Sequence, residues 1–96
     1  MIPYFTAAAD LELRETVQWY DQQLHGLGDR FGSAVKETVK RIQAFPEAST
    51  VDIDGFRRVY VKGFPYKLIY KLVDDDIWIV AVAHGHRMPQ YWKDRI

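Results

Sequence analysis

The chain has 96 residues and no cysteine, so disulfides, thiolate metal sites and cysteine nucleophiles are excluded. Hydrophobic residues make up 48% of the sequence and aromatic residues 15%, which supports one packed core and excludes intrinsic disorder. No apolar run approaches the roughly 20 residues of a membrane span and no signal peptide is apparent, so we expect one domain, residues 1–96, in a cytoplasmic protein.

The formal net charge of zero hides an uneven distribution along the chain. Residues 1–56 contain five Arg or Lys against nine Asp or Glu, whereas residues 57–96 contain eight against four. Three of those four acids form the run Asp74-Asp75-Asp76, which predicts a turn. The C-terminal half is therefore cationic, which indicates an acidic partner or a polyanion.

A short strand and a helix are predicted at the N-terminus. The strand covers residues 2–5, and Thr6 or Asp10 is the candidate N-cap of the helix that follows. Apolar residues then recur on one helical face, namely Leu13, Val17, Tyr20 and Leu24. Gly26 and Gly28 interrupt this pattern, which predicts a tight connection.

A second helix is predicted after this connection. Its apolar stripe consists of Leu27, Phe31, Val35, Thr38, Ile42 and Phe45. Pro46 ends the stripe, because the residue before a proline disfavours the helical conformation. The two helices should therefore form an antiparallel α-hairpin.

Beyond Pro46 the hydrophobic period changes to that of strands, which we expect at residues 57–61, 66–73 and 77–83. The turn Lys62-Gly63-Phe64-Pro65 and the three aspartates should connect them into an antiparallel meander. Residues 88–96 form either one helical turn after Pro89 or a tail. The sequence thus predicts an α+β fold, in the order β-α-α-β-β-β, with both helices packed on one face of the sheet.

The pairing of the strands decides which side chains face the helices. Pairing Tyr60 with Lys67 separates polar from apolar residues best, because a shift of one residue exchanges the faces of a strand. The helix-facing side should then carry Val59, Val61, Tyr66, Leu68, Tyr70, Leu72, Ile77, Ile79, Ala81 and Ala83. The opposite side, which we call the outer face, should carry Arg58, Tyr60, Lys62, Lys67, Lys71 and His84 among Ile69, Val73, Trp78, Val80 and Val82.

This outer face is more apolar than the wet side of an antiparallel sheet usually is. We expect it to bind an acidic amphipathic peptide or a nucleic acid. The alternative is that the lysine stems cover the aliphatic side chains, with Lys71 packed across from Trp78.

Three segments resemble the RelE/ParE family, the toxins of type II toxin–antitoxin modules. They are WYDQQLHGLGDRF (19–31), RRVYVKGFPYKLIYKL (57–72) and VAHGHRMPQYWKDR (82–95), which together extend over almost the whole chain. The motifs LG-x-x-F, FPY-x-x-x-Y and H-x-x-R-x-P-x-Y-W favour the ParE-like branch, often described as plasmid stabilisation proteins. The resemblance implies that the first strand joins the same sheet as the meander.

The resemblance also implies partners. A cognate antitoxin would wrap the toxin with its C-terminal segment in a hetero-oligomer that contacts DNA through the antitoxin. Two modes of toxicity are implied: non-enzymatic inhibition of DNA gyrase, as for ParE, or ribosome-dependent mRNA cleavage by a RelE-like endoribonuclease. We favour the gyrase inhibitor, and expect no cofactor and no contact with a membrane.

A ribonuclease would need a base, an acid and cations that stabilise the phosphorane. By position, the resemblance matches Arg58, Lys67 and Arg87 to the cations, and Tyr91 to a catalytic tyrosine; His84 could also transfer protons. Tyr60 stands where RelE has another lysine, and Tyr91 follows Arg87 more closely than in RelE, which favours the inhibitor. His84 and His86 could share a metal ion, but no third ligand is evident and no metal is expected.

The expected contacts with antitoxin or target are Arg58, Tyr60, Lys62, Lys67, Ile69, Lys71, Trp78, Val80, Val82, Arg87 and Trp92. Structural alternatives stay open for several of these residues. Arg57 and Arg58 could protect an edge strand, His84 could be a structural hydrogen bonder, and Tyr91 and Trp92 could pack the tail onto the core.

Overall fold

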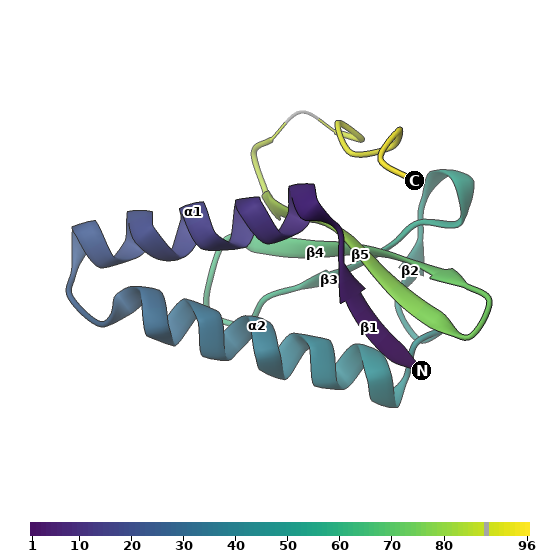
Figure 1. Cartoon of the computed structure of the whole chain (residues 1–96), viewed down its shortest axis with the longest axis horizontal. Helices are drawn as coiled ribbons and strands as arrows, with labels where there is room; N and C mark the ends of the chain where they lie inside the picture. Colours follow the sequence, from purple (N-terminus) through teal and green to yellow (C-terminus); the bar gives the residue numbers. More distant parts are fainter. Residues whose placement is uncertain (88) are drawn as a thin grey trace.

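A computed structural model of the chain describes residues 1–87 and 89–96 as a five-stranded sheet with two helices on one face (Figure 1). Strand β1 (Ile2–Phe5) precedes helices α1 (Ala7–Gln23) and α2 (Leu27–Ala44). Strands β2 (Thr50–Val51), β3 (Arg57–Tyr60), β4 (Tyr66–Val73) and β5 (Asp76–His84) follow, with a 3-10 turn at Ile53–Gly55. The predicted α+β fold is confirmed, and the two-residue strand β2 is the addition.

The helical hairpin forms where its end signals predict. The Thr6 hydroxyl accepts a hydrogen bond from the Ala9 N–H at 3.2 Å and so caps α1. Between the helices, Gly26 adopts a φ of 87°, in the left-handed region that suits glycine. The Gly28 N–H then donates to Asp21 Oδ1 at 2.7 Å, which fastens the start of α2 to the end of α1.

The predicted stripe of α2 is buried at Phe31, Val35, Thr38 and Ile42. It ends one residue earlier than expected, because the helix stops at Ala44 and Phe45 is 71% exposed. Leu24 is likewise exposed beyond the end of α1. In each helix, the last residue predicted to be in the core lies just beyond the end of the helix and is therefore exposed.

The family-like motifs meet in one aromatic cluster beneath the hairpin. The Phe31 ring centroid lies 5.0 Å from that of Phe64 and 5.2 Å from that of Tyr66, and Tyr20 packs against all three rings. Such edge-on aromatic pairs add roughly 0.5–1.5 kcal/mol each beyond their burial. The cluster therefore joins the α-hairpin to the β3–β4 turn.

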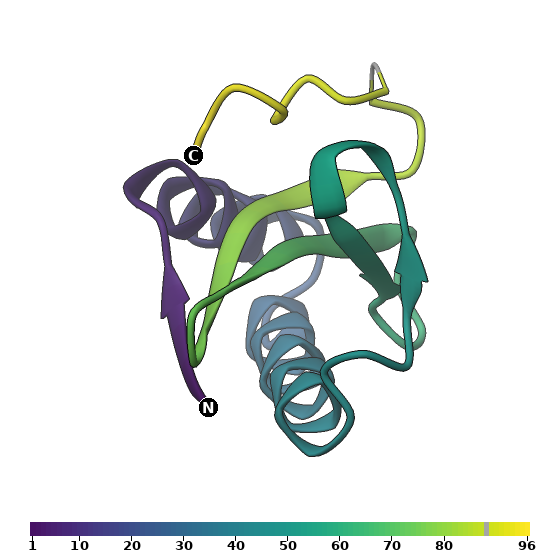
Figure 2. The same ribbon diagram turned by 90° about the vertical axis from the view of Figure 1, so that its right-hand side faces the viewer.

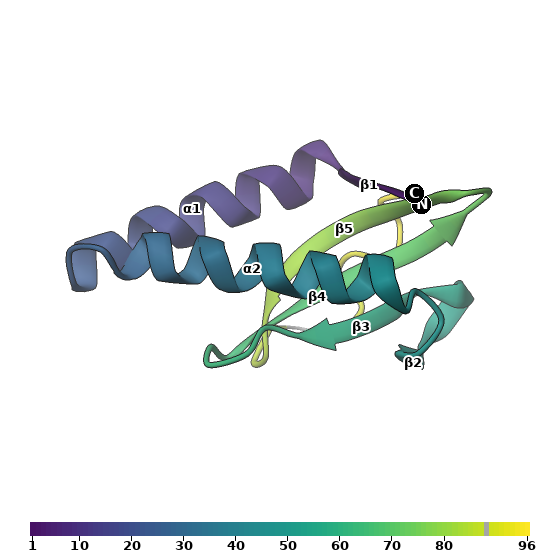
Figure 3. The same cartoon turned by 90° about the horizontal axis from the view of Figure 1, so that it is seen from below.

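The strand order is β1-β5-β4-β3-β2, and β1 runs parallel to β5 while all other pairs are antiparallel. The predicted register is confirmed at both hairpins, since Tyr60 pairs with Lys67 and Val73 pairs with Asp76. Figure 3 shows both helices on the same side of this sheet.

A bulge in β5 changes the faces that period two predicts. Ile69 pairs with Ala81 but the next residue, Tyr70, pairs with Ile79, so Val80 is an extra residue on β5. Beyond the bulge the side chains exchange faces. The bulge cannot be read from alternation alone, because it breaks the alternation.

Four predicted face assignments are therefore wrong. Val82 belongs to the core under the helices, and the His84 ring lies 5.1 Å from that of Tyr66 on the same side. Ala81 belongs to the apolar cluster of the outer face, and Ala83, which pairs with Lys67, follows it to that side.

The outer face is closed by the chain itself. Ile69 is 1% exposed, Val80 0% and Trp92 2%, in one cluster with Phe56 and Ala81. Figure 2 shows the yellow C-terminal segment running back over this face toward α1. The expectation of an open apolar outer face is wrong, because the tail that follows β5 provides its cover.

Candidate functional site

The C-terminal segment, residues 89–96, is a run of turns anchored by one aromatic side chain. The Trp92 ring centroid lies 4.8 Å from that of Phe56, and Tyr91 packs at the margin of the same cluster. Main-chain hydrogen bonds from Lys93 to Gln90 and from Arg95 to Trp92 close the turns. Of the two predictions for residues 88–96, a tail packed on the core is therefore the better description; Met88 lies outside the described residues.

A carboxylate on α1 holds this segment in place. Glu12 accepts hydrogen bonds from the Tyr91 hydroxyl at 2.8 Å and from Arg95 Nη1 and Nη2 at 2.9 and 3.1 Å. The Arg95 and Glu12 side chains are only 22% and 14% exposed. A bidentate, charge-assisted ion pair of this kind is among the stronger polar contacts in proteins. We call Glu12, Tyr91 and Arg95 the Glu12 network.

The same network completes the edge of β5. Strand β1 pairs only as far as Ile79, so β5 continues without a strand on that side. There Glu12 Oε1 accepts from the Val82 N–H at 3.0 Å, and Arg95 Nη1 donates to the Val80 carbonyl at 2.8 Å. These two side chains thus satisfy main-chain groups that a further strand would otherwise pair.

The environment of Tyr91 fixes its protonation state. Burial, and then the hydrogen bond to Glu12, raise the pKa of the Tyr91 phenol well above its ordinary value. The bond to Glu12 also raises the pKa of Arg95. At neutral pH the Tyr91 hydroxyl is therefore a proton donor committed to Glu12, and a poor proton acceptor.

Arg87 lies on the ring that this network orients. Its guanidinium carbon is 4.2 Å from the Tyr91 ring centroid, and that of Arg95 is 4.9 Å away. The Arg87 side chain is exposed, and no ion pair to it is present among residues 1–87 and 89–96.

Two of the expected contact residues, Tyr60 and Lys67, share the outer face with Arg87. Tyr60 is 59% exposed and pairs across the strands with Lys67, which in turn pairs with Ala83. The Gly85 N–H donates to the Pro65 carbonyl at 2.9 Å, so the end of β5 and the β3–β4 turn meet at the same end of the sheet. We call Tyr60, Lys67 and Arg87, which lie toward this end of the sheet, the outer basic patch.

Other expected contact residues have partners within the chain. Arg58 forms an ion pair with Asp52 at 3.5 Å, and Lys71 Nζ lies 5.0 Å from the Phe56 ring centroid. Trp78 pairs with Lys71 and stacks on Tyr4 at 4.9 Å. The remaining apolar positions, Ile69, Val80, Val82 and Trp92, are buried and so are not available on the surface of the free chain.

Of the candidate residues for proton transfer, Tyr91 lies against Arg87 but its hydroxyl donates to Glu12, and His84 lies elsewhere. His84 lies on the helix side, where its Nδ1 accepts from the His86 N–H at 3.0 Å, as expected of a structural histidine. Lys62 is exposed but borders α2, near Ala34 and Arg41. Among the described residues, no group of three metal-ligating side chains is present, nor a helix long and apolar enough to cross a membrane.

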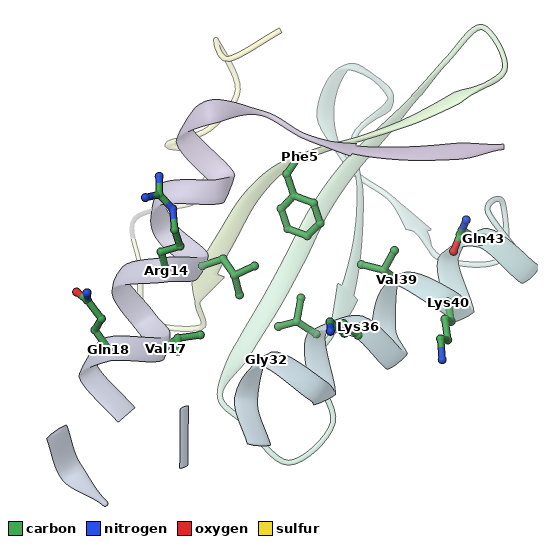
Figure 4. A pocket seen from close by; sticks show the side chains of 11 residues that line it. Phe5, Arg14, Val17, Gln18, Gly32, Lys36, Val39, Lys40 and Gln43 are labelled. Carbon is green, nitrogen blue, oxygen red and sulfur yellow. The ribbon is translucent and has the colours of Figure 1, made fainter. Parts of the chain in front are cut away.

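A groove that the sequence did not predict lies between the two helices (Figure 4). It has a volume of about 670 Å³, and its apolar walls are Phe5, Leu13, Val17, Val35 and Val39. Arg14, Lys36 and Lys40 stand at its rim, with no acid in the lining. Arg14 and Lys40 pair with Asp10 and Glu37, but such exposed pairs contribute only about 0–1 kcal/mol and exchange readily. Gly32 is the sequence feature that could have indicated this groove, because a residue without a side chain within α2 leaves space there.

The chain is similar in sequence and in fold to proteins of one toxin family. The family model described as the ParE toxin of the type II toxin–antitoxin system parDE matches residues 4–89. Toxin ParE2 of Mycobacterium tuberculosis, from two strains, is 30% identical over 79 residues, which are 81% of this chain and 75% of that protein. The solved structure of the chromosomal ParDE system from P. aeruginosa has a TM-score of 0.78 at 16% identity, covering 88% of this chain and 95% of that one, and so shares the fold. The chain therefore belongs to the ParE toxin family of type II toxin–antitoxin systems.

Proposed function

We propose that the chain arrests bacterial growth by binding DNA gyrase without catalysing a reaction, and that a cognate antitoxin neutralises it. The observation that carries the non-enzymatic mode is the disposition of the proton-transfer groups. The Tyr91 hydroxyl donates to Glu12, and His84 lies on the helix side of the sheet. Arg87 is exposed and can bind an acidic surface; the Tyr91 beside it is committed to Glu12, so neither of these described candidates, Tyr91 or His84, is placed to transfer a proton there.

The experiment compares the two modes of toxicity with the same purified protein. It should inhibit supercoiling by gyrase in a dose-dependent way and leave ribosome-bound mRNA intact. Cleavage of the mRNA with no effect on gyrase would refute the proposal and would direct attention to His86, which is exposed at the end of the sheet. Lys93→Ala, an exposed substitution in the same C-terminal segment, is the matched control for variants of Arg87.

The interhelical groove is the proposed docking site of the antitoxin. Its apolar walls and cationic rim are complementary to an amphipathic helix that carries acidic residues beside its apolar stripe. Within the described part of the chain, the outer face offers no comparable apolar surface, because Trp92 and Tyr91 of the C-terminal segment cover it. Toxin and antitoxin would therefore form a hetero-oligomer through the α-hairpin, with DNA contacted by the antitoxin.

A substitution at Gly32 tests this docking site without disturbing the core. A Cβ at this position meets no atom within 4 Å, so Gly32→Leu should fill the groove while the chain folds normally. We expect the antitoxin to bind about tenfold more weakly or worse, whereas growth arrest by the toxin alone is unchanged. Ser33→Leu adds the same side chain outside the groove, and this variant should bind the antitoxin as tightly as the wild-type toxin does. Equal weakening by both variants would place the antitoxin elsewhere.

A further inference from the structure

We propose that Glu12 is a positioning residue, which holds the guanidinium of Arg87 in the orientation that meets the target. The inference rests on the proposed function, in which the outer basic patch makes that contact. Glu12 itself touches no exposed cation of the patch, and it stands 79 residues before Tyr91 and 83 before Arg95 in the chain. Its effect on Arg87 would therefore pass through the C-terminal segment.

The first link is between Arg87 and Tyr91. The main chain of Arg87 is tied back to β5, because its N–H donates to the His84 carbonyl at 3.0 Å. Its side chain has no carboxylate partner among the described residues, and the contact that orients it is the Tyr91 ring at 4.2 Å. A cation over an aromatic face is directional but weak when exposed. The orientation of Arg87 thus depends on the ring staying where it is.

The second link is between Tyr91 and Glu12. The phenol donates to Glu12 Oε2, and the Arg95 guanidinium, which lies over the same ring, donates to both oxygens of that carboxylate. Glu12 in turn is fixed to the sheet by the Val82 N–H. The carboxylate is therefore the point at which helix α1, strand β5 and the C-terminal segment are joined, and without it the ring has no polar tether.

The alternative is that Glu12 serves only the stability of the fold, by capping the edge of β5. The two roles predict different behaviour in a double-mutant cycle. A residue that acts through Arg87 loses its effect when Arg87 is absent. A residue that only stabilises the fold has the same effect whether Arg87 is present or not.

The cycle uses wild type, Glu12→Gln, Arg87→Ala and the double variant in the intact chain. Its readout is the amount of soluble toxin per cell that gives half-maximal growth arrest, which does not presuppose the target. We expect Glu12→Gln to raise this amount about tenfold in the wild-type background and by less than about twofold in the Arg87→Ala background. Glu15→Gln, an exposed glutamate on the same helix, should change neither.

A second variant distinguishes the positioning role of Glu12 from a general loss of the fold. Tyr91→Phe keeps the ring under Arg87 and the Arg95–Glu12 pair but removes the hydroxyl, and should raise the amount about threefold, with the same dependence on Arg87. In Glu12→Gln, amide hydrogen exchange should accelerate at residues 90–95 while β4 stays protected. Equal effects of Glu12→Gln in both backgrounds, or unchanged arrest despite accelerated exchange, would overturn the positioning role. A coupled cycle from a toxin that leaves gyrase active would retain that role and refute only the proposed target.

Discussion

Replacing Gly28 by alanine should destabilise the protein, whereas the same replacement four residues later should stabilise it. At Gly28 a Cβ would collide with the main-chain carbonyl oxygen of Val17 and lie 2.7 Å from Asp21 Oδ1. Relieving such overpacking costs about 1–3 kcal/mol, and losing the hydrogen bond from the Gly28 N–H to a carboxylate costs about 1.5–3 kcal/mol more. Because the two losses share one displacement of the helices, we expect a total of roughly 2–4 kcal/mol.

Gly32→Ala is the matched control for this prediction. A Cβ added at this position of α2 has no neighbouring atom within 4 Å, and alanine is favoured over glycine in a helix by about 1 kcal/mol. Urea denaturation should therefore show opposite shifts in the midpoint for the two variants, with the slope unchanged. The melting temperature should fall by roughly 8–32 °C for Gly28→Ala, given about 4–8 °C per kcal/mol in a domain of this size. If Gly28→Ala were as stable as wild type, the close approach of the two helices in the hairpin would be refuted.

Two further predictions concern the C-terminal segment. Trp92→Ala removes the buried anchor of this segment and should cost up to about 3–5 kcal/mol of the free energy with which the segment packs on the sheet. Amide hydrogen exchange should accelerate at residues 90–95 and stay unchanged in α2. Exchange that stays slow at residues 90–95 would contradict the packing of Trp92. The raised pKa of Tyr91 means that the folded state favours the protonated phenol, so its contribution is complete below the ordinary value of 10.0 and declines as pH rises above it. Unfolding followed by urea at pH 8 and pH 11 should show a smaller loss of stability for Tyr91→Phe than for wild type, and an equal loss would refute the buried, hydrogen-bonded environment of the Tyr91 phenol.

The local elements of the fold could be predicted because their signals are local. The apolar spacing of the helices, the Thr6 cap and the turn residues between strands each act within a few positions of the element they define. The register followed from separating polar from apolar residues, and the pairing of Tyr60 with Lys67 confirms it.

The arrangement on the outer face could not be predicted because it depends on contacts distant in sequence. The bulge at Val80 breaks the alternation on which the faces were assigned, and nothing in the sequence marks it. Glu12 stands in a helix among other charged residues, and its partners lie about 80 residues away. The apolar residues on that face therefore indicate a binding surface for a partner, but in the structure the chain's own Trp92 covers them.

The groove shows a related limit of prediction from sequence. Apolar residues such as Val17 are expected to face the core, and the pattern does not tell how much of the space between two helices their side chains fill. Here Gly32 leaves part of that space open. Helical periodicity thus located the α-hairpin correctly but gave no sign of the surface that the antitoxin is proposed to occupy.

The most direct test of this account is a methyl NMR titration of the labelled toxin with the unlabelled C-terminal segment of its antitoxin. We expect the resonances of Leu13, Val17 and Val39 in the groove to shift, while Ile69 and Val80 beneath the C-terminal segment stay in place. Shifts at Ile69 and Val80, together with loss of the buried environment of Trp92, would instead show that the antitoxin displaces the tail and binds the outer face.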